Sequence, residues 1–234
     1  MTKRYITMAI LVFCLAAAVS CVGVGDIVFE EKTVALGSAD EVEVELRMNS
    51  GELKLEGGSD DLMDAEFSYN VERWKPTVDY KILGRRGILK VRQGKSDRIP
   101  VGNSHNKWLI RLKEQVSIML TIDFGAGEGD LDLRGINLAS LDIDMGVGDL
   151  SLDLSGIDPK DLSVTLDGGV GSAVVYLPRS MNVTVRVDGG LGSVDAPGFQ
   201  KSGNVYSYET LGENVPRLDV NVDAGIGSID LKLK

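Results

Sequence analysis

Asp144-Met145-Gly146-Val147-Gly148 is one of five copies of a short motif, in which an Asp is followed by any residue, a Gly, an apolar residue and a second Gly. The copies recur about every twenty residues, with one longer interval before the last. A fixed period of this length is typical of stacked structural units. The copies begin at Asp123, Asp144, Asp167, Asp188 and Asp223.

Each copy lies between two stretches in which apolar and polar residues alternate. Leu141 and Ile143 precede the second copy, and Leu150 and Leu152 follow it, with Asp or Ser between them. A period of two predicts half-buried strands. About twenty residues of extended chain is far longer than a typical strand, so each unit must fold back on itself. The sequence therefore predicts an all-β chain with a β-solenoid-like stack of glycine-cornered repeats, and a plain β-sandwich is the alternative.

The paired glycines are the predicted structural corners of this stack. Glycine allows positive φ and close backbone packing, and we expect the apolar residue between each pair to point into the core. The corner glycines are Gly125, Gly127, Gly146, Gly148, Gly169, Gly171, Gly190, Gly192, Gly225 and Gly227.

The amino terminus has the pattern of an export signal. Lys3-Arg4 precede an apolar run from Ile6 to Val19, which is too short to span a membrane. The following Ser20-Cys21 completes a stretch that resembles the bacterial lipobox, so residues 1–20 are predicted to be a lipoprotein signal peptide and Cys21 the lipidated residue. Ordinary cleavage that leaves Cys21 as a free thiol is the alternative. Cys14 would be removed, so the mature chain has no second Cys for a disulfide.

We expect three segments after the signal. Residues 21–37 form a tether, residues 38–113 an N-terminal β region with a turn at Asn49-Ser50-Gly51, and residues 114–234 the repeat domain. The insertion from Gly198 to Pro216 supplies an extra strand or lid at one edge. The formal net charge is −10, and removal of Lys3 and Arg4 makes the mature chain more acidic still. This charge disfavours nucleic-acid binding.

Two groups of stretches resemble known families. Met48-Asn49-Ser50-Gly51-Glu52-Leu53-Lys54-Leu55 and Ala65-Glu66-Phe67-Ser68-Tyr69-Asn70 resemble the toast-rack N-terminal domain. GAGEGDLDL, GVGDLSLDL, GGVGSAVVYLP and GIGSIDLKL resemble the C-terminal domain of cell-wall-active antibiotic response proteins and the related "putative adhesin" repeats. The resemblance covers about residues 40–234. It implies a β-solenoid-like stack in an envelope protein, without enzymatic activity, that acts in adhesion or in stress signalling.

The sequence offers little material for catalysis or for metal binding. His105 is the only histidine and is expected to be solvated in a polar loop, and the Gly-rich stretches lack the Lys and the following helix of a phosphate-binding loop. A calcium ladder is disfavoured because the period and the residues after the glycines differ from the nonapeptide motif. We expect no cofactor, no metal and no catalytic residue. A carbohydrate-active enzyme that uses surface carboxylates such as Asp130/Asp132 or Asp142/Asp144 is the alternative.

The segment from Arg73 to Lys113 is rich in Lys and Arg, whereas the segments on both sides of it are acidic. One interpretation is that these cations pair across strands with the acidic N-terminal strands. The other is a surface for an anionic envelope component. The residues of this candidate surface, here called the basic belt, are Trp74, Arg85, Arg86, Lys90, Arg92, Arg98 and Trp108.

Together these features predict a non-enzymatic binding or scaffolding module of the bacterial cell envelope. Cys21 would anchor it to a membrane. Because Val22 rather than Asp follows Cys21, that membrane would be the outer one in a bacterium with two membranes. The expected partner is an envelope protein, a lipid or a glycan, and the sequence does not distinguish among them.

Overall fold

A computed structural model describes residues 22–94, 100–101, 103–189 and 191–234. Strands make up most of this part of the chain, and its one helical element is the short 3-10 helix η1 (Glu72–Trp74). None of the described helical structure is long and apolar enough to cross a membrane. The predicted all-β, solenoid-like fold is confirmed.

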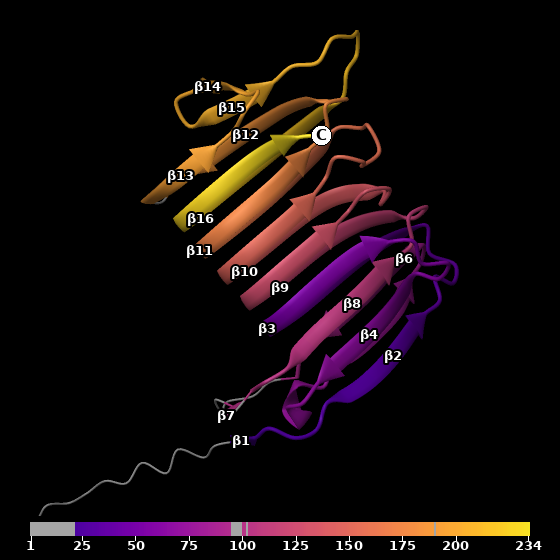
Figure 1. The fold of residues 1–234 in the computed structure, drawn as a ribbon. Coiled ribbons are helices and arrows are strands. Elements are labelled where there is room, and N and C mark those ends of the chain that lie inside the picture. Colours follow the sequence, from indigo (N-terminus) through magenta and orange to yellow (C-terminus); the bar gives the residue numbers. More distant parts are fainter. Residues whose placement is uncertain (1–21, 95–99, 102, 190) are drawn as a thin grey trace, which may run out of the picture.

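Five long strands form the body of the molecule. They are β3 (Glu41–Gly57), β9 (Ser117–Asp132), β10 (Leu138–Asp153), β11 (Leu162–Leu177) and β16 (Arg217–Leu233). They run parallel to one another, and each bends at its glycine corner (Figure 1). Because of this bend, the two halves of each strand belong to two layers, and their inward apolar side chains share one core.

The register is continuous across the stack. Asp144 of β10 lies opposite Asp123 of β9 on one side and Asp167 of β11 on the other, and Gly148 lies between Gly127 and Gly171. Equivalent residues of the repeat are therefore neighbours on adjacent strands, which is the arrangement that the fixed sequence period predicts. Each bent strand is here called a rung.

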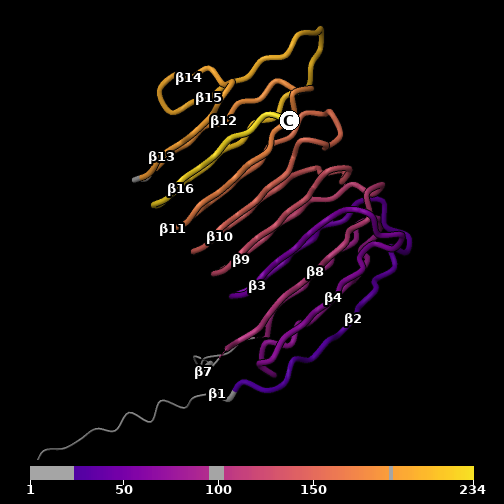
Figure 2. The backbone as a smooth tube through the Cα atoms, in the orientation of Figure 1, coloured from indigo at the N-terminus to yellow at the C-terminus, as the bar shows by residue number. Residues whose placement is uncertain are grey.

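The order of the rungs in space differs from their order in the chain. β16, which carries the fifth copy of the motif, pairs with β11 on one side and with β12 (Asn182–Asp188) and β13 (Leu191–Asp195) on the other. Figure 2 shows the C-terminal strand, in yellow, between these orange segments. The fifth copy is thus inserted between the third and the fourth, and the C-terminal strand does not form the exposed end of the stack.

The N-terminal region begins the same stack. Within β3, Ser50 pairs with Ala126 and Gly51 with Gly127, so Met48-Asn49-Ser50-Gly51 is a corner equivalent to the five copies of the motif. The expected turn at Asn49-Ser50-Gly51 is therefore a bend inside one long strand. This corner lacks the sequence motif because Arg47 and Asn49 stand in place of the first Asp and the first Gly.

Shorter strands close this end of the stack. One layer continues from β3 to β6 (Arg86–Arg92) and β5 (Thr77–Leu83). The other layer continues from β3 to β8 (Asn106–Leu112), β4 (Met63–Tyr69) and β2 (Val28–Val34). β1 (Val22–Gly23) pairs with β7 (Pro100–Val101) beside them. Trp74 of η1 is buried at this end.

Residues 21–37 were expected to form a tether, but this segment contains β1 and β2. β2 pairs with β4 along its whole length. The sequence did not reveal this strand because it lies at the edge of the sheet, where most of its residues are exposed on both faces and no apolar alternation is required. The predicted boundary between residues 113 and 114 lies between β8 and β9, and the core and the sheet continue across it.

The insertion between β13 and β16 supplies two extra strands, as expected. β14 (Gln200–Ser202) pairs with β15 (Val205–Tyr208), which in turn pairs with β12. Tyr206 of β15 is buried against the core. The insertion therefore covers the last rung on one layer only, because β13 pairs with β16 alone.

Candidate functional site

At the glycine corners, neighbouring rungs lie so close together that no residue with a Cβ atom would fit. A Cβ atom added at Gly148 would lie 1.8 Å from the carbonyl oxygen of Gly127, and one at Gly171 would lie 1.7 Å from that of Gly148. Gly148 also has a φ of +142°, which residues with a side chain rarely adopt. Two independent constraints, close approach and backbone conformation, therefore require glycine here. Gly190 lies outside the described residues.

The apolar residues between the glycines point outward, so the expectation that they enter the core is wrong. Val147, Val170 and Ile226 are 53%, 49% and 55% exposed. They face solvent because the strand bends around the core at this point, which places the convex side of the bend outside. These three side chains lie on adjacent rungs and form a narrow apolar row, here called the corner ridge.

A row of carboxylates runs beside the corner ridge. The first Asp of each motif lies in register with its equivalents on neighbouring rungs, and all five are exposed. Rungs are about 4.8 Å apart, and like charges directly opposite one another destabilise a sheet. Arg47 of β3 lies at one end of the row, with its Nε 3.8 Å from Asp123. In spatial order the row is Asp123, Asp144, Asp167, Asp223 and Asp188.

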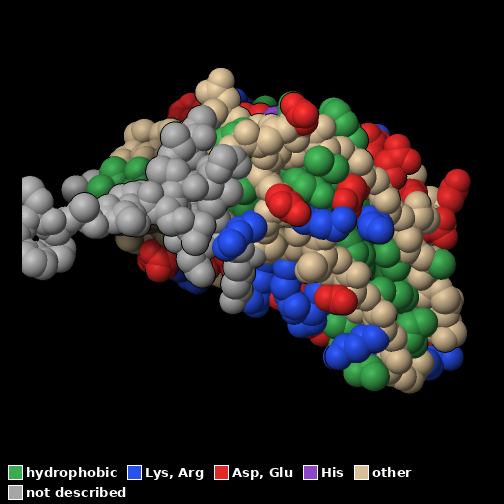
Figure 3. All heavy atoms as spheres, turned by 90° about the horizontal axis from the view of Figure 1, so that it is seen from below, with side chains coloured by type: hydrophobic (Ala, Val, Ile, Leu, Met, Phe, Trp, Pro, Cys, Tyr) green, Lys and Arg blue, Asp and Glu red, His purple; other side chains and the backbone are tan. Residues whose placement is uncertain are grey.

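The cations of the basic belt that the structure describes are paired with carboxylates of β3 and of the residue before it. This pairing follows from the register, because β6 lies beside the first half of β3. Figure 3, seen from below, shows Asp and Glu side chains among and beside the Lys and Arg side chains. The pairs are Arg85 with Asp40, Arg86 with Glu41 (2.9 Å), Lys90 with Glu45 (2.6 Å) and Arg92 with Glu45 (3.3 Å).

Glu45 is the centre of this pairing. It also lies 2.6 Å from Nε of Arg47, and its side chain is only 10% exposed. Burial alone would raise the pKa of Glu45, but hydrogen bonds from Lys90 and Arg92 outweigh burial and hold this pKa below its ordinary value. A single buried carboxylate therefore pairs with two of the four described cations of the belt.

The two tryptophans of the basic belt are core residues. Trp74 is 8% exposed and Trp108 is fully buried, and the ring of Trp108 packs edge-to-face against Phe67. Neither ring is presented to a partner at the surface. Arg98 and Cys21 lie outside the described residues. Binding of an anionic partner by the belt stays a prediction.

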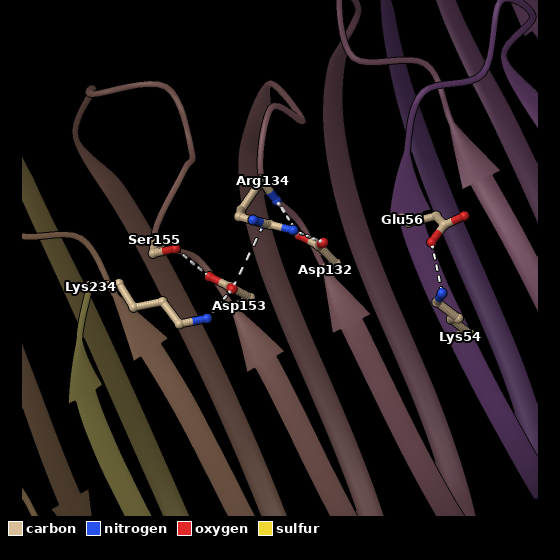
Figure 4. Close-up of polar contacts among 7 residues, drawn as sticks. All are labelled: Lys54, Glu56, Asp132, Arg134, Asp153, Ser155 and Lys234. Carbon is tan, nitrogen blue, oxygen red and sulfur yellow. Dashed lines mark hydrogen bonds and ion pairs between the residues drawn. The ribbon is translucent and has the colours of Figure 1, made fainter.

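A second polar network joins the ends of rungs β9, β10 and β16. Asp153 accepts hydrogen bonds from Nζ of Lys234 (2.8 Å) and from the hydroxyl of Ser155 (2.6 Å), and Arg134 lies between Asp153 and Asp132 (Figure 4). Burial would raise the pKa of Asp153, but its hydrogen bonds with Lys234 and Ser155 lower it. Asp132 and Asp153 thus form ion pairs that connect the rungs.

A small apolar cavity lies under the corners of β10, β11 and β16. Phe124 of β9 and Met145 of β10 fill the inside of the bend, but the equivalent positions on β11 and β16 are Gly168 and Ala224. The missing side-chain volume leaves a cavity of about 50 Å³, lined almost wholly by apolar atoms. The cavity brings no titratable pair together, and its position follows from the loss of large side chains along one row.

His105 is half-buried rather than solvated, and its Nε2 lies 2.8 Å from the hydroxyl of Ser68. Asp130, Asp142 and Asp144 are exposed on outward faces of the strands, as their alternation predicts. Within the described residues, no group of three or more His, Cys, Asp or Glu side chains is arranged to hold a metal ion.

The comparisons with known proteins agree with this architecture. Residues 24–176 match the family described as the N-terminal domain of toast_rack, DUF2154. The chain belongs to this family, and the predicted resemblance is confirmed. The match crosses the predicted boundary at residue 113, as does the continuous stack of rungs. The curated proteins compared with the chain include no match.

Solved structures give the fold a close counterpart. A structure described as a "putative cell adhesion protein" from Clostridium sporogenes is 35% identical, with a TM-score of 0.85, over 89% of this chain and 100% of its own. A "putative adhesin" from Bacteroides fragilis is 8% identical over 88% of this chain and 97% of its own, with a TM-score of 0.34. The second similarity is too weak to support an argument. The first shows that this fold has a counterpart among solved structures.

Proposed function

We propose that this chain is a lipid-anchored, non-enzymatic protein of the bacterial cell envelope whose stack acts as a binding module in adhesion. The observation that carries this proposal is the similarity to the Clostridium sporogenes protein, whose description names cell adhesion and whose whole length is matched at 35% identity. The lipobox-like stretch at Cys21 supports an anchored position.

The geometry of the stack favours binding through an extended surface. Solenoid-like stacks present long surfaces on which the same side chain recurs at each repeat. Here the corner ridge and the carboxylate row lie side by side on adjacent rungs. A partner that contacts such rows makes the same small interaction several times, which suits adhesion better than the capture of one small molecule.

The basic belt gives a second hypothesis about the partner, namely an anionic lipid or glycan. Reversal of Arg85, Arg86, Arg92 and Arg98 to Glu should then abolish retention on anionic vesicles while the chain remains folded. Because the described cations of the belt are paired with Asp40, Glu41 and Glu45, we expect this retention to be weak in the wild-type chain.

The test of the proposed function is crosslinking in place. The wild-type chain and a Cys21→Ala chain are expressed in a bacterium that processes lipoproteins, crosslinked in intact cells, purified and analysed by mass spectrometry. The proposal predicts acyl groups on Cys21 and a reproducible envelope partner that is absent from the Cys21→Ala sample. Recovery of the same material from both chains would contradict it.

The identity of the partner distinguishes two versions of the function. A surface protein or glycan would support adhesion. A membrane histidine kinase would instead support a role in envelope-stress signalling, which the family resemblance also implies.

A further inference from the structure

An exposed apolar patch lies where the chain leaves the predicted anchor. Ile27, Val28 and Phe29 are 47%, 44% and 78% exposed, and they are consecutive in the sequence. Val28 and Phe29 are neighbours on β2 and point to opposite faces, so the patch covers both sides of this edge of the sheet. Most other large exposed apolar side chains of the described residues occur singly, at turns or on the corner ridge. A run of three on an edge strand requires an explanation, because such a run in water favours aggregation.

The position of the patch is fixed by the fold. Val28 pairs with Tyr69 and Phe29 with Ser68 at the start of β2, and the backbone N–H of Gly25 donates a hydrogen bond to the carbonyl of Asn70. β1 and the start of β2 lie together at one end of the molecule (Figure 1). The patch is therefore held rigidly at the end from which the chain continues toward Cys21.

The length of chain between the patch and Cys21 is short. Five residues lie between Cys21 and Ile27, and the six steps of extended chain from one to the other span at most about 20 Å. Acyl groups on Cys21 would lie in the bilayer, so the patch would be within reach of the region between headgroups and acyl chains. Large apolar side chains are favoured at this depth.

The charges around the patch do not oppose this contact. Glu30, the next residue of β2, accepts hydrogen bonds from Nζ of Lys75 (2.5 Å) and from the hydroxyl of Tyr69 (2.9 Å). Its negative charge is thus partly offset by a cation on the neighbouring η1–β5 segment. Glu31 and Asp26 are exposed and can remain in water while the apolar side chains enter the interface.

We propose that Ile27, Val28 and Phe29 form a membrane contact that inserts into the surface of the bilayer and sets the orientation of the stack. This inference rests on the proposed anchoring through Cys21 and adds a second point of attachment. One lipid anchor leaves a protein free to tilt, whereas an anchor and a rigid apolar patch together fix which end of the stack faces the membrane.

The test uses the acylated full-length mature chain in phosphatidylcholine vesicles whose acyl chains carry bromine, which quenches tryptophan fluorescence on contact. Phe29→Trp places a probe in the patch. Leu83→Trp is the matched control, because Leu83 is an exposed apolar residue (59%) at the last position of β5, where β5 pairs with the start of β6. The native Trp74 and Trp108 are buried, and the wild-type chain measures their contribution.

The proposal predicts that brominated lipid quenches the added emission of Phe29→Trp at least about twofold more than that of Leu83→Trp. Equal quenching of the two variants in acylated protein would overturn the membrane contact and leave the anchored function intact. The mass of the mature chain separates the two failures. If Cys21 of membrane-bound protein carries no acyl group, the anchored function and the membrane contact are both overturned.

Discussion

The substitution Gly148→Ala tests whether the stack depends on the close approach of neighbouring rungs at the glycine corners. The ideal Cβ position at this residue is 1.8 Å from the carbonyl oxygen of Gly127, whereas real contacts of this kind are essentially never shorter than 3.0 Å. The neighbouring rungs would have to separate by more than about 1 Å, which stretches the ladder hydrogen bonds on both sides of the corner. Each bond left unsatisfied costs about 1–3 kcal/mol.

Backbone strain adds to this cost. Gly148 has a φ of +142°, and a residue with a side chain in this region is strained by about 1–3 kcal/mol. We expect Gly148→Ala to lower the free energy of unfolding by about 4 kcal/mol or more, which corresponds to a melting temperature lower by about 10 °C or more in a chain of this size.

The assay is urea unfolding followed by far-UV circular dichroism, on the mature chain with Cys21→Ala as the common background. Gly58→Ala is the control, because Gly58 also has a positive φ (+103°) but an added Cβ would meet no atom within 4 Å. This control measures strain alone, and we expect a loss of about 1–2 kcal/mol. If Gly148→Ala were no more destabilising than Gly58→Ala, close approach of the rungs would not be the reason for the glycine corners.

Three further predictions concern the interior and the polar networks. Gly168→Ala should stabilise the chain by about 0.5–1 kcal/mol in the same urea assay, because the added methyl meets only one atom at 4.0 Å and fills part of the cavity; destabilisation would contradict the cavity. Asp153→Asn should cost about 1–2 kcal/mol at pH 7. Because the folded chain lowers the pKa of Asp153, this contribution is complete above the unfolded pKa of about 4 and is lost as the pH falls through the folded pKa. The urea midpoints of the wild-type and Asp153→Asn chains should therefore converge in acid, and a constant difference would refute the lowered pKa. Glu45→Gln should cost about 1–3 kcal/mol and increase retention on anionic vesicles in a sedimentation assay, because it releases three cations; unchanged retention would argue against the belt as an anionic-partner surface.

The sequence was most informative where one physical requirement is repeated. The glycine motifs and the alternation around them predict the bent strands and their stacking, because both the corner and the half-buried strand leave a strict pattern. The segregation of charge along the sequence also suggested, as one of two interpretations, that the basic belt pairs with the acidic N-terminal strands, and Arg86 and Lys90 form such pairs with β3. Because these features depend on the chemistry of nearby residues, they can be predicted from a single sequence.

Features that depend on long-range placement were not predictable in this way. Nothing in the local sequence shows that β16 lies between β11 and β12, since each rung has nearly the same pattern and can pair with any other. β2 is an edge strand with little burial, so it lacks the alternation that reveals strands. Trp74 and Trp108 flank a basic segment in the sequence, but their burial depends on how η1 and β8 pack against the core.

Val147, Val170 and Ile226 show how a correct motif can still be misread. The glycines required a bend, but the direction of the side chain between them depends on which side of the bend is convex. The sequence gives an apolar residue at this position, and apolar residues are usually placed inside. Only the structure therefore reveals that they are exposed. The corner ridge is an apolar surface in contact with water.

The most direct test of the central claim is attachment under flow. Bilayer-coated beads that carry the acylated wild-type chain are allowed to settle on a layer of bacterial envelope fragments, and the fraction that remains is measured as the flow increases. An anchored adhesion module predicts that these beads resist flows that remove bare bilayer-coated beads, and that excess soluble Cys21→Ala chain abolishes this resistance. Detachment at the same flow with and without the protein would contradict the account.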